Sequence, residues 1–547
     1  MAGRMHAQVM VVGGGPVGML VAAELAAQGV DTLVLEAEAT TSERPRATTL
    51  HARAVQCLAR RGYFFAPEPR PAGGSAAMPF HFAGIPGLSI TVPEAEPVPI
   101  LKAPQAELER LFESRARANG VRVLREHRVT EMTQDRDGVR ITAQSPQGCR
   151  SFAVGYVVGA DGARSTVREL AGIASDVGLP TMSALTGLVR ITDPQAVPVG
   201  WHRTPRGWLI AKKGPDGRTL VHTLTEGDAS DDRHLPLTLD ELSEKAAWVA
   251  GHDIEMTDPR WLGRFSDYTR LARTYRAGRF FLAGDAAHVH FPIGGQGLST
   301  GVLDALDLSW KLGLVARGAA SDGLLDTYGP ERRPAARRVI DNTRAQVMLM
   351  RPGDEVDSLR ALLAGLLESG RGNDFLSAMI SAQDTVLPSS PRRRYRSLRE
   401  GTFLDNTELS TPQGPSDVIG LLGRSGRPLL LLLGEGGRRC ADTARAWARS
   451  LHVVHCAPTA ALPYDALLVR PDGYIAWASD GGESLADALV SLFGTGAETE
   501  AGTETGAEAV AGTGTGAEKA TGAAVDTDPC PEAPSAPARV PAVTGCR

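Results

Sequence analysis

Leu282-Ala-Gly-Asp-Ala-Ala-His-Val-His-Phe-Pro-Ile-Gly-Gly-Gln-Gly-Leu-Ser-Thr-Gly301 is the stretch of sequence that decides the fold of this chain. It reads as the end of a buried strand, a loop with one acid, a glycine-rich turn and the start of a helix over 298–316. Glycines let the backbone approach a flat ligand closely, and a helix N-terminus turns its positive end toward that ligand. The stretch therefore predicts one end of a site for an elongated, flat ligand.

A second glycine segment, Gly13-Gly14-Gly15-Pro16-Val17-Gly18, lies near the N-terminus. It follows a short apolar strand and opens a helix, and Glu36 ends the strand after that helix. The spacing of Gly13, Gly15 and Gly18 lets backbone amides meet a diphosphate, and Glu36 stands where a ribose-binding acid is expected. Because no second segment of this kind follows, the pattern predicts one stably bound dinucleotide, and any other dinucleotide would bind transiently.

The composition is that of a multidomain protein without a polyanion-binding surface. A chain of 547 residues is too long for one core, and a net charge of −5 with mixed signs argues against nucleic acid as a partner. The longest apolar run, Leu429–Leu433, is too short to span a membrane, and the six cysteines show no CxxC spacing. We therefore expect a cytoplasmic monomer or homodimer with no metal site and no membrane association.

Changes of character along the chain predict four parts. Residues 1–182 and 271–395 form one discontinuous α/β dinucleotide-binding domain, and residues 183–270 form an inserted β-sheet domain that binds the substrate. Residues 396–493 form a separate α/β unit. Residues 494–547 are rich in glycine, alanine, threonine and glutamate, and we expect them to be a disordered tail.

Five motifs over about residues 1–340 resemble those of the class A flavoprotein monooxygenases, the p-hydroxybenzoate hydroxylase-like family. Besides the two glycine segments, they are Gly159-Ala160-Asp161-Gly162-Ala163-Arg164-Ser165, Arg46 and Gln105. The most similar group is that of the actinobacterial aromatic polyketide hydroxylases. That resemblance implies a Rossmann-like FAD domain and a thioredoxin-like C-terminal domain, indicated here by Leu468–Tyr474 and lacking a redox cysteine pair.

The resemblance also implies a cofactor, a reaction and a set of site residues. FAD would be bound permanently, NADPH or NADH would reduce it transiently, and O2 would be the co-substrate. Hydroxylation of a polycyclic aromatic polyketide or related phenol would proceed through a flavin hydroperoxide. The residues implied to bind FAD are Gly13, Gly15, Gly18, Glu36, Arg46, Gln105, Asp161, Asp285, Gly297, Leu298 and Ser299, and those implied to act in catalysis are Pro292, Gly295 and Arg46.

One position departs from the family pattern, and several roles stay open. Ser299 replaces the usual asparagine, where it could cap the helix or change flavin affinity or reoxidation. Asp304 matches the usual acid. We expect His288 to brace the backbone rather than transfer protons, and Arg332–Arg338 to form a solvated helix face. The alternative functions are Baeyer–Villiger or epoxidising oxygenation, antibiotic-inactivating hydroxylation, and a non-catalytic flavin-binding accessory protein.

Overall fold

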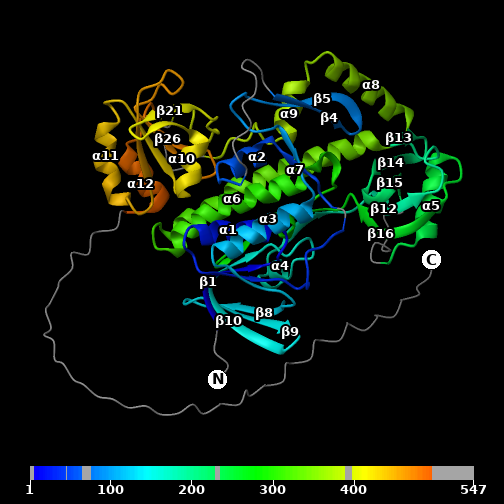
Figure 1. Cartoon of the computed structure of the whole chain (residues 1–547), viewed down its shortest axis with the longest axis horizontal. Helices are drawn as coiled ribbons and strands as arrows, with labels where there is room; N and C mark the ends of the chain where they lie inside the picture. Colours follow the sequence, from blue (N-terminus) through cyan, green and yellow to red (C-terminus); the bar gives the residue numbers. More distant parts are fainter. Residues whose placement is uncertain (1–4, 45, 64–75, 228–234, 389–396, 496–547) are drawn as a thin grey trace, which may run out of the picture.

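The computed structural model describes residues 5–44, 46–63, 76–227, 235–388 and 397–495, so the predicted tail falls almost wholly outside the described part. Two long helices, α6 (Gly297–Ala316) and α7 (Tyr328–Met350), cross the middle of the molecule. Figure 1 shows the C-terminal unit at one end of these helices and a β-sheet covered by α5 (Leu239–Ala250) at the other.

The main sheet has the strand order β18-β19-β10-β1-β2-β7, extended by β9 and β8 beside β10. The central strands pair in parallel, and their side chains are apolar and buried, as in Val9–Val12. The strand bounds are β1 Met5–Val12, β2 Thr32–Leu35, β7 Arg122–Leu124, β8 Arg128–Gln134, β9 Val139–Ser145, β10 Gly148–Gly159, β18 Arg276–Ala277 and β19 Phe280–Leu282.

The helices of this domain pack the sequence motifs against the sheet. α1 (Pro16–Ala27) contacts both α3 (Gln105–Ala118) and α6, and short α4 (Thr166–Leu170) lies beside the end of β10. The carboxyl ends of β19, β10, β1 and β2 meet at one edge of the sheet. Ligands of open parallel sheets bind at this edge, so the fold itself brings the three glycine-containing motifs together.

A second, antiparallel sheet is built from residues between the two halves of the first domain. Its strand order is β13-β14-β15-β12-β16, and one face packs on α5 through Leu185, Leu209 and Val221. The other face packs toward Phe291 through Ala184 and Trp208. The strand bounds are β12 Met182–Ile191, β13 Gly200–Thr204, β14 Gly207–Lys213, β15 Thr219–Glu226 and β16 Met256–Ser266.

Smaller elements close the space between the two sheets. β3 (Thr49–His51) pairs with β6 (Ile100–Lys102), and α2 (Ala52–Ala59) follows β3 directly. The hairpin of β4 (Ala76–Phe82) and β5 (Ile85–Val92) packs under helices α8 and α9. The bounds of these and the remaining connecting elements are α8 Asp354–Glu368, α9 Asn373–Ile380, β11 Ser175–Gly178, β17 Thr269–Ala272 and β20 His288–Val289.

The C-terminal unit is a four-stranded sheet of order β24-β23-β25-β26 flanked by α10, α11 and α12. β23 and β24 are parallel, whereas β25 and β26 are antiparallel to their neighbours, which is the strand arrangement of the thioredoxin fold. Cys440 and Cys456 are both free thiols. The bounds are β21 Glu408–Thr411, β22 Gly414–Asp417, β23 Leu429–Leu433, β24 His452–Cys456, β25 Ala466–Val469, β26 Ile475–Ala478, α10 Val418–Ser425, α11 Arg438–Ala444 and α12 Leu485–Phe493.

The predicted fold class is confirmed: an α/β Rossmann-like domain carries an inserted sheet and a thioredoxin-like C-terminal domain. Across the described ranges, no helix combines the length and the apolarity needed to cross a membrane.

Candidate functional site

The first glycine turn connects β1 to α1 at the edge of the main sheet. A Cβ on Gly13 would lie 2.4 Å from the carbonyl oxygen of Ala160, and one on Gly18 would lie 2.0 Å from the carbonyl oxygen of Gly13. A Cβ on Gly15 would meet nothing within 4 Å. Gly13 and Gly18 are therefore required by protein packing, whereas Gly15 faces open space at the N-terminus of α1, where a diphosphate is favoured.

This difference predicts distinct results for two alanine variants. Gly18→Ala should destabilise the fold by about 1–3 kcal/mol, because the backbone of the turn must shift to admit the methyl group. Gly15→Ala should fold with an unchanged melting temperature but retain bound dinucleotide about tenfold less well, because its methyl group would enter the ligand's space. Gly323→Ala, whose Cβ would come no nearer than 3.8 Å to another group, is the matched control. A normal dinucleotide content in Gly15→Ala would contradict the assignment.

Glu36, Arg46 and Gln105 lie at the same edge of the sheet, near the end of β2. Glu36 ends β2, and its carboxylate accepts hydrogen bonds from the amides of Gly14 and Glu38. The amide of Gln105, the first residue of α3, donates to the carbonyl of Ala47 at 3.0 Å, which holds Gln105 beside the exposed Arg46 segment. The positive charge of Arg46 also reaches Asp285. The structure thus brings all these predicted residues to one edge of the sheet.

Two carboxyl groups face the space beyond this edge. One oxygen of Asp161 accepts from the amide of Val167 at 3.0 Å, and its other oxygen has no partner among the described residues. Asp285 is exposed, yet the surrounding protein raises its pKa by desolvation, opposed by His288 and Arg46. Asp285 is thus accessible to solvent and also closely surrounded by protein. Its carboxylate and the unpartnered oxygen of Asp161 are acceptors available to a ligand.

Asp304 of α6 is fully buried and ties the Gly284-Asp285 turn to His288 and Arg332. Its carboxylate accepts from the amide of Gly284 at 3.1 Å, from His288 Nε2 at 2.6 Å and from Arg332 Nε at 2.9 Å. Burial alone would raise the pKa of Asp304, but His288 and Arg332 outweigh it and lower that pKa. The expectation that His288 braces the backbone agrees with this geometry.

The expectation that all of Arg332–Arg338 is solvated is wrong for its first member. Arg332 is 3% exposed, and its guanidinium is held by Asp304. The run of charges conceals this role because a surface arginine and a buried one look alike in sequence. The available signal was the acid about two helical turns into α6, Asp304. Arg337 and Arg338 do lie on the exposed face.

The turn from Pro292 to Gly297 ends the stretch that opened the sequence analysis. Pro292 is exposed, and Gly294 and Gly295 have φ of +74° and +64°, which presents backbone rather than side chains on one face of the turn. α6 begins at Gly297 after Gln296, whose side chain does not cap it. The first amides of Gly297, Leu298 and Ser299 have no carbonyl partner within the helix and point toward the space in front of it.

Ser299 does not cap this helix, contrary to one of the roles considered for it. It is the third residue of α6, and its hydroxyl accepts a hydrogen bond from the amide of His51 at 3.0 Å. His51, which the sequence analysis missed, also donates from Nε2 to the carbonyl of Gly294 at 2.7 Å. Desolvation lowers the pKa of His51 to about 4, so the ring is neutral and carries a free Nδ1 acceptor.

Side chains of α7 fix the same turn from behind. Gln296 accepts from Asn342 at 2.6 Å and donates to the carbonyl of Ile380, and Gln346 donates to Asn342 while accepting from the amide of Ala83. This buried amide network holds the turn in one conformation, which is a requirement for a preorganised site.

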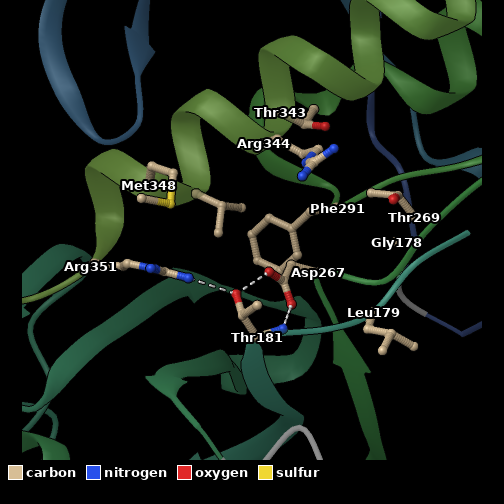
Figure 2. A pocket seen from close by; sticks show the side chains of 11 residues that line it. Gly178, Leu179, Thr181, Asp267, Thr269, Phe291, Thr343, Arg344, Met348 and Arg351 are labelled. Atoms are coloured by element: carbon tan, nitrogen blue, oxygen red, sulfur yellow. Dashed lines mark hydrogen bonds between the residues drawn. The ribbon is translucent and has the colours of Figure 1, made fainter.

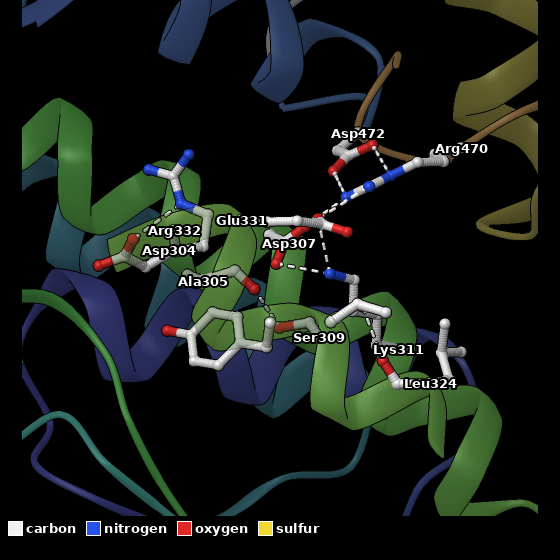
Figure 3. Close-up of polar contacts among 12 residues, drawn as sticks. Asp304, Ala305, Asp307, Ser309, Lys311, Leu324, Glu331, Arg332, Arg470 and Asp472 are labelled. Atoms are coloured by element: carbon white, nitrogen blue, oxygen red, sulfur yellow. Dashed lines mark hydrogen bonds and ion pairs between the residues drawn. The ribbon is translucent and has the colours of Figure 1, made fainter. Parts of the chain in front are cut away.

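The C-terminal domain contacts α6 and α7 through a buried ionic cluster, which is drawn in Figure 3. Arg470 pairs with Asp472 at 2.7 Å, with Glu331 at 2.8 Å and with Asp307, while Lys311 pairs with Asp307 at 2.9 Å and with Glu331 at 2.7 Å. Glu331 precedes Arg332 on α7, and Asp307 lies one turn after Asp304 on α6. The cluster therefore abuts the ion pair that braces the Gly284-Asp285 turn.

Between the two sheets, two groups of aromatic side chains pack beside the Pro292 turn. On one side, rings follow one another at 5.2, 4.8 and 4.6 Å from His51 through Phe80 and His81 to Trp201. On the other side, Phe265 lies 5.7 Å from Phe291, next to Pro292, and 6.2 Å from His222. Two groups of aromatic rings beside the same turn suit contact with a flat, apolar ligand.

His222 should make the stability of the protein depend on pH. Desolvation, followed by the nearby Lys212, lowers its pKa from 6.5 to about 4. Below about pH 6.5, His222 of the unfolded chain binds a proton, whereas His222 of the folded chain stays neutral down to about pH 4. The free energy of unfolding therefore falls by about 2–3 kcal/mol as the pH drops from about 6.5 to about 4. His222→Gln should flatten this part of a urea-unfolding profile, with the exposed His252→Gln as control. Equal slopes in both variants would contradict this reading.

Figure 2 shows a separate polar pocket on the far side of Phe291. Asp267 accepts from the Thr181 hydroxyl at 2.7 Å, and Arg351 donates to the same hydroxyl at 3.0 Å. Its volume of about 180 Å³ is below that of sites for drug-sized ligands. It is therefore too small to hold a fused-ring substrate.

Comparisons with known proteins agree with this arrangement. Residues 6–343 match the family model of the FAD binding domain, and residues 397–496 match that of the aromatic-ring hydroxylase C-terminal domain. The chain is 36% identical over 511 residues to 12-dehydrotetracycline 5-monooxygenase/anhydrotetracycline 6-monooxygenase of Streptomyces rimosus, covering 90% of this chain and 99% of that one. It is 35% identical over 494 residues to dialkyldecalin synthase of Streptomyces rugosporus, covering 89% and 99%.

A solved structure is similar over nearly the same length. The anhydrotetracycline hydroxylase OxyS of Streptomyces rimosus superimposes with a TM-score of 0.79 at 34% identity, covering 90% of this chain and 100% of that one. The similarity spans both sheets and the C-terminal unit, so it concerns the whole assembly of domains.

Proposed function

The chain belongs to the FAD-dependent aromatic-ring hydroxylases, the class A flavoprotein monooxygenases, and on this premise we propose that it hydroxylates a polycyclic aromatic polyketide or a related phenol. The observation that carries the proposal is the pair of aromatic groups that lie beside the turn at Pro292–Gly297, one through His51 and one through Phe291. We also propose that it acts as a cytoplasmic monomer or homodimer, which follows from its composition alone.

The residues of the sheet edge fit FAD. The open face of Gly15 admits a diphosphate, and the unpartnered oxygen of Asp161 is an acceptor that the protein leaves unused. We propose that Glu36 binds the adenosine ribose, Asp285 the ribityl chain, and Arg46 and Gln105 the region between them. The amides of Gly297, Leu298 and Ser299 would then face the pyrimidine edge of the ring, where a helix N-terminus stabilises negative charge.

Bound FAD, reduced by NAD(P)H and H⁺, supplies the transfer of one oxygen atom of O2 to the substrate while the other leaves as water. The chain's own part is to orient the substrate and exclude water. Phe291 and Phe265 hold the substrate's flat face, and Pro292 and Gly295 leave an amide-lined space beside the turn. His51 keeps this space rigid through its bond to the carbonyl of Gly294.

The proposal is tested by reconstituting the protein with FAD and measuring NADPH and NADH oxidation with candidate polycyclic phenols. We expect a yellow holoenzyme, oxidation accelerated by an aromatic ligand, and a product that has gained one oxygen atom. The structure of the product separates hydroxylation from ring-oxygen insertion or epoxidation. A protein that binds FAD but whose NAD(P)H oxidation responds to no aromatic ligand would reject the proposal.

The similarity to dialkyldecalin synthase favours one second candidate. That relative forms a decalin ring system, as its name says, so the second candidate function is a ring closure without oxygen transfer. This candidate predicts a product with the same mass as its substrate and no consumption of NAD(P)H. Mass analysis of products formed with and without NADPH distinguishes the two functions.

A further inference from the structure

The pocket drawn in Figure 2 lies next to the Pro292 turn, because Phe291, the residue before Pro292, is part of its lining. The rest of the lining comes from α7 and from the segments 178–181 and 267–269. Its volume of about 180 Å³ is slightly larger than the roughly 150 Å³ of a cavity that holds benzene. The pocket therefore admits one six-membered ring with a small substituent.

One side of the pocket offers a hydrogen-bond donor and an acceptor that meet at the same group. The Thr181 hydroxyl donates to Asp267 at 2.7 Å and accepts from Arg351 at 3.0 Å. Thr181 is the one hydrogen-bond acceptor that the described residues give to this guanidinium, which has five N–H donors, and a Glu226 oxygen lies 3.6 Å from its Nε. The Asp267 oxygen that Thr181 contacts can accept a second hydrogen bond. A donor beside an acceptor is the complement of a primary carboxamide, which has one carbonyl oxygen and one NH2 group.

Arg344 adds a positive charge to the same pocket. Arg344, Met348 and Arg351 are spaced four and three residues apart, so they share the face of α7 that lines the pocket. Arg344 is exposed, and within the described ranges it makes no ion pair. A guanidinium that is accessible and unpaired suits a phosphate, which it binds through charge-assisted hydrogen bonds.

We infer that this pocket binds the nicotinamide end of NAD(P)H, with the ring against Phe291, the carboxamide between Asp267 and Arg351, and the adjoining phosphate at Arg344. The assignment rests on the proposed function, which uses NAD(P)H as the reductant. The Gly13–Gly18 turn is occupied by FAD in that function, so the second dinucleotide has to be recognised by side chains elsewhere. NAD(P)H donates one hydride to bound FAD and leaves as NAD(P)⁺, and one solvent proton completes the two-electron reduction.

The test uses nicotinamide mononucleotide, which carries the ring, the carboxamide and one phosphate without the adenosine half. In saturation-transfer NMR, the methyl groups of Leu179 and Val347 should pass saturation to its ring protons, because both side chains line the pocket. The same compound should inhibit anaerobic reduction of the FAD-loaded enzyme by NADPH competitively. Nicotinic acid mononucleotide should bind at least about tenfold more weakly, because its carboxylate would face Asp267.

Two variants separate the parts of the pocket. Arg344→Met should raise the Kd of nicotinamide mononucleotide about tenfold, since it removes the contact to the phosphate. Asp267→Asn should remove most of the preference for the amide over the acid, because the repulsion of the carboxylate is lost. Arg371→Met is the matched control, because Arg371 is also exposed but lies outside the pocket. Melting temperature and FAD content should stay at the wild-type values in Arg344→Met and Arg371→Met.

The possible results distinguish this assignment from the proposed function. Absent binding of nicotinamide mononucleotide, an unchanged Kd in Arg344→Met, or reduction by NADPH that the mononucleotide does not inhibit would each overturn the assignment. Tighter binding of the acid than of the amide would also overturn it and would identify the pocket as a site for an aromatic acid. Binding that depends on Arg344 in an enzyme that forms no oxygenated product would instead reject the proposed function and leave the assignment standing.

Discussion

Asp304→Asn is expected to lower the free energy of unfolding by about 3–5 kcal/mol and to cost most of the bound FAD. The substitution keeps the shape of the side chain but leaves the Arg332 guanidinium and His288 buried without their shared anion. A side-chain amide has a single acceptor oxygen, so it cannot serve Gly284, His288 and Arg332 together, and the turn that carries Asp285 is held less firmly. Denaturant unfolding and the FAD-to-protein absorbance ratio measure the two effects.

The expected loss depends on pH in a defined direction. Because His288 and Arg332 lower the pKa of Asp304 below its ordinary 3.8, the carboxylate contributes stability above that value and loses it as pH falls through the lowered pKa. The difference between the wild type and Asp304→Asn should therefore be constant near neutral pH and shrink in acid.

Two further variants make this prediction specific. Asp326→Asn removes an exposed partner of Arg276 and should cost less than about 1 kcal/mol. Adding Arg332→Met to Asp304→Asn removes the uncompensated cation and should restore part of the stability. A double variant no more stable than the single one would show that the ion pair is not the source of the loss.

The sequence predicts the cofactor edge well because its features are local. The requirement for glycine at Gly13 and Gly18 arises from a tight turn between adjacent elements, and strand ends that carry Gly159 and Gly284 must meet in a parallel sheet. A local pattern of this kind survives in any chain that folds this way.

The residues that support this edge from distant parts of the chain cannot be predicted from local sequence patterns. His51 meets Gly294 across 243 positions, and Arg470 meets Asp307 across 163. The sequence does not show whether an arginine, a histidine or a serine is solvated or buried. For this reason the charge pattern placed Arg332 on a solvated face, and Ser299 was considered as a helix cap. Only tertiary packing decides these cases, and neither periodicity nor charge pattern records it.

Arg470→Met is expected to lower the free energy of unfolding by about 3–5 kcal/mol and to loosen FAD, although Arg470 belongs to another domain. The substitution leaves Asp307 and Glu331 buried together with Lys311 as their only cation in the cluster (Figure 3). Desolvation and Asp307 already raise the pKa of Glu331 against the pull of Arg470 and Lys311, so removing Arg470 raises that pKa further.

The sign of the pH dependence identifies Glu331 as the group responsible. In the variant, the folded state holds a proton on Glu331 that the unfolded state has lost, so stability falls as pH rises above the ordinary pKa of a glutamate and through the raised pKa of Glu331. Glu331→Gln added to Arg470→Met should remove this slope and recover stability, whereas the exposed Arg445→Met should change nothing. The domain should stay docked in every variant, because Arg53 stacks 3.5 Å from the Phe403 ring and the Cys57 thiol donates to the carbonyl of Asp472. A loss of FAD affinity in Arg470→Met with the domain still docked would therefore mean that the thioredoxin-like domain acts on the flavin edge through α6 and α7, and unchanged FAD affinity would reduce its role to stability alone.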